Sequence, residues 1–177
     1  MKFTAQFTSR NGKLFFKDSE IAVPLECIVF IDACEIPLDA AALEQFARSF
    51  DDAFIVAVRV PRSSVDIGET RYDEAFLAVL RTFLKNREAR NSFCNTYEII
   101  VPECDNSAVY SEEAAMRFIA AMCHTARRIK DCASVIGFAI PEAFSTSQAT
   151  AFIEEMRIKH SHYIFFSKTS RADAVLY

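Results

Sequence analysis

The chain has 177 residues, of which 51% are hydrophobic and 25% are charged, and its formal net charge is −4. This length fits one domain with a sizeable buried core, and the composition excludes intrinsic disorder for most of the chain. A small negative charge without a long basic run argues against nucleic acid as a partner, and no apolar run approaches the roughly 20 residues of a membrane span.

The first 17 residues predict a β-hairpin. Phe3, Ala5 and Phe7 alternate with polar residues, and Asn11-Gly12 is the dipeptide most typical of a tight hairpin turn. The N-terminal sequence contains no apolar stretch of the kind found in signal peptides. We therefore expect a cytoplasmic protein whose six cysteines are reduced.

From residue 27 onward, short apolar runs rich in Val, Ile and Phe alternate with longer segments of helical periodicity. Nearly continuous apolar runs are typical of parallel strands that are buried on both faces. Five strands are predicted, over residues 27–31, 54–58, 97–101, 135–140 and 163–166. The four intervening segments carry apolar residues at i, i+3, i+4 and i+7, which predicts four crossover helices.

Local signals mark the ends of these elements. Asp39 is positioned to cap the first helix, and Thr70 with Asp73 and Ser145 with Gln148 have the spacing of a capping box. A proline follows four of the apolar runs, at positions 37, 61, 102 and 141. Because proline cannot donate a ladder hydrogen bond, we expect each of the four to end a strand.

The predicted fold is a single α/β domain of residues 1–177, with a hairpin at 1–17 and repeated βα units over 27–167. Two architectures fit this pattern: an open parallel sheet of flavodoxin-like size, or half of a (β/α)₈ barrel whose base the hairpin covers. A full barrel of about 250 residues is longer than this chain. An uncovered sheet edge or face after the fifth strand would favour self-association, so we expect a homo-oligomer.

Polar residues recur at the carboxyl ends of the predicted strands, where both architectures bind ligands. Glu103 and Glu142 each follow a strand-ending proline in consecutive units, and we predict that they form a catalytic pair. Paired carboxylates act as general acid and base, or hold a divalent cation through oxygen ligands. The other predicted ligand-binding residues at this rim are Asp32, Glu35, Arg59, Arg62, Asp105 and Lys168, of which Arg59 and Arg62 would orient an anionic group.

Several other kinds of site are disfavoured. Three isolated glycines cannot form a Walker loop or a dinucleotide fingerprint, and the cysteine spacings match no zinc site. The His160–His162 pair has no evident third metal ligand. Basic residues near the ends of the predicted helices are expected to be solvated, among them Arg81, Lys85, Arg87 and Arg90.

The sequence carries no family signature that we recognise. The leading functional hypothesis is a small-polar-ligand-binding protein that is a carboxylate-based hydrolase or lyase, with the site at the strand ends. The alternative is a non-catalytic homo-oligomeric interaction or regulatory module. A third reading is half of a larger barrel that a second copy or another subunit completes.

Overall fold

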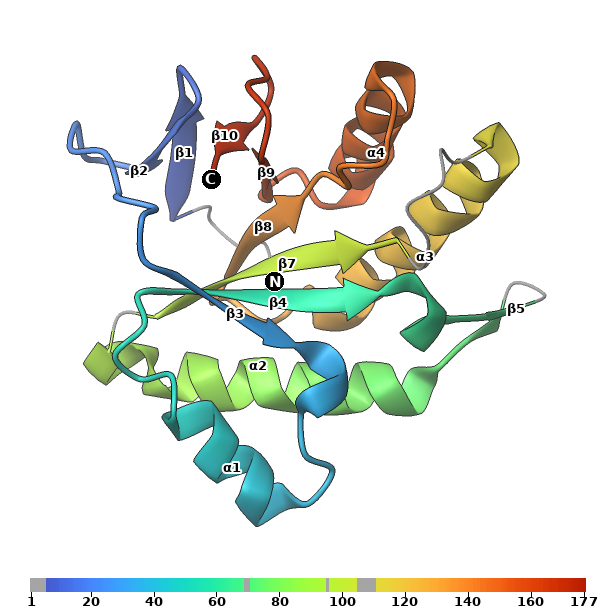
Figure 1. The fold of residues 1–177 in the computed structure, drawn as a ribbon. Helices are drawn as coiled ribbons and strands as arrows, with labels where there is room; N and C mark the ends of the chain where they lie inside the picture. Colours follow the sequence, from blue (N-terminus) through green and yellow to red (C-terminus); the bar gives the residue numbers. More distant parts are fainter. Residues whose placement is uncertain (1–5, 69–70, 95, 105–110) are drawn as a thin grey trace.

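The computed structural model describes residues 6–68, 71–94, 96–104 and 111–177 (Figure 1). Its main sheet has six parallel strands in the order β10-β9-β8-β7-β4-β3. These strands are β3 (Ile28–Asp32), β4 (Ile55–Pro61), β7 (Tyr97–Glu103), β8 (Val135–Ala139), β9 (Ile164–Ser167) and β10 (Val175–Leu176). Each strand lies beside its predecessor in this sheet. Of the two predicted architectures, this is the order of a half-barrel, because a doubly wound sheet reverses its strand order part-way.

All four crossover helices pack on one face of the sheet. They are α1 (Ala40–Arg48), α2 (Glu74–Cys94), α3 (Glu112–Ile129) and α4 (Thr146–Lys159). Leu43, Phe83, Phe118 and Phe152, one from each helix, belong to a single core cluster with side chains from the helix-facing side of the strands. Helices on one face leave the other face concave, as in consecutive units of a barrel.

The N-terminal hairpin covers the part of the concave face that lies at the amino ends of the strands. Its strands are β1 (Phe7–Arg10) and β2 (Lys13–Phe16), and both turn residues have positive φ, 52° at Asn11 and 71° at Gly12. Positive φ at both positions is the type I′ geometry that the Asn-Gly dipeptide favours, so the predicted turn is confirmed. A second core cluster joins Phe7 and Leu14 to Ile55 and Tyr97 of the sheet.

The predicted strands and helices are all present, with boundaries shifted by a few residues. Three strands were not predicted. They are β10, which pairs with β9, and β5 (Asp66–Gly68) with β6 (Arg71–Tyr72), a small antiparallel pair inside the connection after β4. The strand β7 continues through Pro102, contrary to the prediction that this proline ends it. The pairing of β7 with β8 has already finished at Ile100, so on that side Pro102 interrupts no ladder.

The helix caps follow the sequence signals with one correction. The Asp39 carboxylate accepts hydrogen bonds from the backbone N–H groups of Ala41 and Ala42, and Ser145 and Gln148 form a complete capping box. At α2 the cap is Asp73, which accepts from the backbone of Phe76, whereas Thr70 lies outside the described residues. None of the described helices has an apolar stretch long enough to cross a membrane.

Candidate functional site

A cleft of about 790 Å³ opens on the concave face at the carboxyl ends of the strands. The parallel register brings Asp32 of β3 opposite Arg59 of β4, and Arg59 opposite Val101 of β7. Since side chains alternate along a strand, Glu103 lies on the same face as Val101. The charged residues that line the cleft are Arg59, Glu103, Glu142 and Lys168. No residue of the hairpin strands β1 and β2 lines this cleft.

Arg59 stands at the centre of the charged group. Its guanidinium lies 3.6 Å from the carboxylates of both Asp32 and Glu103, and 5.1 Å above the ring of Phe30. These contacts hold the guanidinium by charge and by a cation–π interaction. Both ion pairs are longer than a hydrogen bond, so neither of these two carboxylates takes up an N–H donor of Arg59.

The far side of the cleft carries a second ion pair. Lys168, which directly follows β9, lies 2.6 Å from the carboxylate of Glu142, which follows β8. Both side chains are about half exposed, at 49% and 64%. An exposed ion pair of this kind adds little to stability. A ligand can therefore replace either partner at a small cost in free energy.

Tyr177 lines the cleft and was not predicted as a site residue. Its ring centroid lies 6.5 Å from that of Phe30 and 6.2 Å from that of Phe166. Burial raises the pKa of its phenol to about 12, and the nearby carboxylates of Glu142 and Glu103 add to this while Arg59 opposes it. The hydroxyl therefore keeps its proton at neutral pH and offers a donor among the carboxylates.

The remaining predicted site residues lie elsewhere. Glu35 belongs to a 3₁₀ turn, Ala33–Glu35, and is not part of the cleft lining. Arg62 also sits in a 3₁₀ turn, Arg62–Ser64, where its guanidinium lies 3.2 Å from the carboxylate of Asp66. Asp105 lies outside the described residues. The structure thus gathers Asp32, Arg59, Glu103, Glu142 and Lys168, and separates Glu35 and Arg62 from them.

The described residues offer no group of three or more His, Cys, Asp or Glu side chains arranged to hold a metal ion. His160 and His162 lie at the end of α4, and burial lowers the pKa of both imidazoles. Burial also raises the pKa of the thiols of Cys123 and Cys132, to about 11 and about 12, so neither is a ready nucleophile.

Comparison with known proteins shows a fold and no family. No family model matches the sequence, and no curated protein matches it either. Among solved structures, the fold is similar to that of a rutinosidase from Aspergillus niger, with a TM-score of 0.51 and 8% sequence identity. The match covers 70% of this chain and 46% of the rutinosidase chain, so the present chain spans less than half of that protein.

Proposed function

We propose that this protein binds a small, neutral, hydroxyl-rich ligand of the carbohydrate class in the cleft at the strand ends. The observation that carries the proposal is the alternation of acceptors and donors around one cleft. Carboxylates of Glu103 and Glu142 accept hydrogen bonds, whereas Arg59, Lys168 and the Tyr177 hydroxyl donate them. A hydroxyl group both donates and accepts, so a polyol matches such a mixture better than a ligand of a single charge.

Charge argues against an anionic ligand, although the sequence had assigned Arg59 that role. Three carboxylates, those of Asp32, Glu103 and Glu142, surround two cations, Arg59 and Lys168. An added anion would meet an excess of like charge. Phe30 and Tyr177 also line the cleft, and aromatic side chains suit the apolar face of a sugar ring.

The second candidate function is hydrolysis of a glycosidic bond, with Glu103 and Glu142 as the carboxylate pair. It is favoured by their position at the carboxyl ends of adjacent parallel strands, where barrel enzymes act, and by the fold similarity to a rutinosidase. Fold alone does not carry function. In this structure Glu103 is paired with Arg59 and Glu142 with Lys168, so binding ranks first.

The test is a titration followed by amide chemical shifts, with a neutral disaccharide, its component monosaccharides and a sugar phosphate. We expect shifts confined to the cleft, and binding of the neutral sugars in preference to the phosphate. Glu103→Gln or Glu142→Gln should weaken binding about tenfold, since each removes a charged hydrogen-bond acceptor. The matched control is Glu154→Gln, an exposed carboxylate on α4.

Two outcomes would contradict the proposal. Preference for the phosphate would make the cleft an anion site centred on Arg59 and Lys168. Absence of any cleft shift at millimolar sugar would remove carbohydrate as the ligand class. Hydrolysis is tested separately with nitrophenyl glycosides, and it requires turnover that both glutamine variants abolish and Glu154→Gln preserves.

A further inference from the structure

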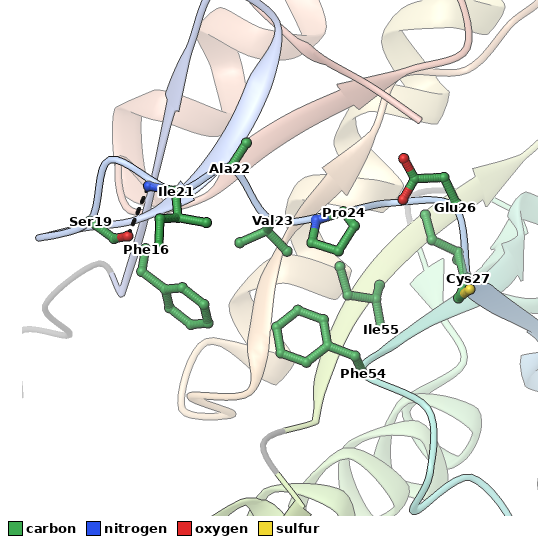
Figure 2. A pocket seen from close by; sticks show the side chains of 11 residues that line it. Phe16, Ser19, Ile21, Ala22, Val23, Pro24, Glu26, Cys27, Phe54 and Ile55 are labelled. Atoms are coloured by element: carbon green, nitrogen blue, oxygen red, sulfur yellow. Dashed lines mark hydrogen bonds between the residues drawn. The ribbon is translucent and has the colours of Figure 1, made fainter.

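A second cavity, of about 410 Å³, opens at the amino end of β3, away from the cleft. We name it the apolar groove. It lies between the hairpin, the segment 19–27 that leads into β3, and the beginnings of β3 and β4. Figure 2 shows the rings of Phe16 and Phe54 and the side chains of Ile21, Val23 and Pro24 around this space.

The walls of the groove are held in place before any partner arrives. The backbone N–H of Val23 donates to the carbonyl of Leu14, and Ala22 forms a β-bridge with Phe15. The Ser19 hydroxyl accepts from the backbone of Ile21, as the dashed line in Figure 2 marks. Preformed apolar cavities of this size are typical of binding sites.

The groove adjoins an open sheet edge. Among the described strands, β3 pairs with β4 alone, so its other edge presents unpaired backbone donors and acceptors. Of the nine exposed large hydrophobic residues in the described chain, four lie in β3 or in the groove: Phe16, Ile21, Val29 and Phe30. An open strand edge beside clustered exposed apolar side chains is a docking surface for another strand.

The charges at this edge decide what kind of strand fits. Glu26 lines the groove just before β3 begins, and Asp32 and Glu35 stand where β3 ends. Pairing of β3 with β3 of a second copy is antiparallel about a two-fold axis, which sets the Glu26 end of one copy against the Asp32 and Glu35 end of the other. Like charges facing each other across paired strands are destabilising.

We propose that the edge of β3 binds an extended strand of a partner protein, apolar in its centre and basic at its ends. Backbone hydrogen bonds to β3 would supply affinity, and one apolar side chain of the partner would enter the groove beside Ile28 and Phe54. Basic residues at the ends of the strand would meet Glu26 and Glu35. Because Phe30 belongs to both β3 and the cleft lining, the bound strand would also lie beside the cleft.

The probe is a labelled peptide of about ten residues, long enough to pass the five residues of β3 with flanks on both sides. Its centre alternates Thr with Val, Ile or Phe, and each end carries two Lys residues. A second peptide replaces Lys with Glu, and a third is N-methylated at alternate central positions. Binding is followed by fluorescence polarisation and by the amide shifts of Ile28–Asp32.

We expect the Lys-ended peptide to bind, the Glu-ended peptide to bind at least about fivefold more weakly, and N-methylation to cost at least about tenfold. Glu26→Lys should abolish the preference between the two peptides, and Glu26→Lys combined with Glu35→Lys should reverse it. Glu20→Lys is the matched control, because this exposed carboxylate lies on the same segment outside the groove lining. Ala22→Trp should weaken binding by filling the groove, since Ala22 is exposed and lines it.

Three results would overturn the proposal. Equal affinity for the N-methylated peptide would mean that no strand is added. Absence of binding by all Lys-ended peptides at millimolar concentration would remove the partner class. Sedimentation of the chain alone as a dimer that Val29→Lys dissociates would assign this edge to a second copy. None of these readouts depends on what the cleft binds.

Discussion

Glu98 and Arg87 are hydrogen-bonded to each other and completely buried between β7 and α2, and the titration of Glu98 makes stability depend on pH. Both side chains are 0% exposed, and Arg87 Nε lies 3.0 Å from Glu98 Oε1. A further N–H of Arg87 donates to the Ala47 carbonyl. Burial raises the pKa of Glu98 from its ordinary 4.5 to about 7, and Ser134 and Arg87 oppose that rise without cancelling it.

The magnitude follows from this pKa. Between pH 4.5 and 7 the folded protein keeps a proton on Glu98 that the unfolded chain releases. The contribution of Glu98 to stability is therefore fully present below pH 4.5 and is lost as the pH rises through about 7. At about 1.36 kcal/mol per pH unit, the loss over this range is about 3 kcal/mol. In Glu98→Gln the side chain is neutral at every pH, so this contribution disappears.

The assay is urea unfolding of the wild type and Glu98→Gln, followed by circular dichroism at intervals from pH 4.5 to 7. We expect the stability of the wild type relative to the variant to fall by about 3 kcal/mol across this range. The lowered pKa values of His160 and His162 act in the opposite direction, but they are common to both proteins and cancel in the difference. Glu154→Gln, an exposed control, should show a constant difference. A constant difference for Glu98→Gln as well would refute the reasoning, because Glu98 would then titrate in the folded protein as it does in the unfolded chain.

Three stability predictions follow from single contacts, each measured as the urea midpoint. Gly137→Ala should cost at least about 3 kcal/mol, because a Cβ there would lie 1.8 Å from the backbone carbonyl oxygen of Ile164, and a loss below about 1 kcal/mol would mean that β9 moves freely. Ser145→Ala should cost about 1 kcal/mol by removing the capping box of α4, whereas Ser147→Ala, which spares the cap bond to the Gln148 backbone, should cost less. Gly12→Ala should cost about 1 kcal/mol, since Gly12 has φ of 71°, and no change would show that the turn relaxes into another type.

The repeated units were predictable because their signals are local. A continuous apolar run such as residues 54–58 is a strand buried between the helices and the hairpin, and the Asp39 and Ser145 caps need only the next three residues. The strand β10 has no such signal. It consists of two residues that pair with β9, and its Leu176 N–H donates to the carbonyl of Gly12 in the hairpin turn. Contacts this distant in sequence are invisible to periodicity.

The site was predictable to the extent that strand register is regular. Asp32, Arg59 and Glu103 were placed together because each stands at a strand end, and parallel pairing keeps those ends level. Arg62 was misplaced because the chain turns directly after Pro61 and returns the guanidinium to Asp66. That pairing has i, i+4 spacing, a signal the sequence did contain. Tyr177 depends on β10 and could not be placed without it.

Arg87 is the clearest error of the sequence reasoning. It was expected to be solvated with Arg81, Lys85 and Arg90, and it is fully buried. Along α2 it occupies the helix face that packs on β7, where Glu98 points outward from the strand toward the helix. An acidic residue inside an otherwise apolar strand run is the signal that a buried cation lies opposite, because an unpaired buried carboxylate is too costly to keep.

The hairpin also bears on whether a second half-barrel completes this one. In a closed barrel, side chains from opposite strands fill the interior in layers. Here Phe7 and Leu14 of the hairpin already occupy the interior at the amino ends of the strands, where they pack against Ile55 and Tyr97. The Phe7 ring lies 4.7 Å from that of Tyr97, which leaves no room for the side chains of an opposing strand at this level. Completion by a full set of βα units would have to displace the hairpin, whereas a single strand added to the edge of β3 leaves it in place. The interior packing therefore favours strand addition over barrel closure as the way in which this edge is covered.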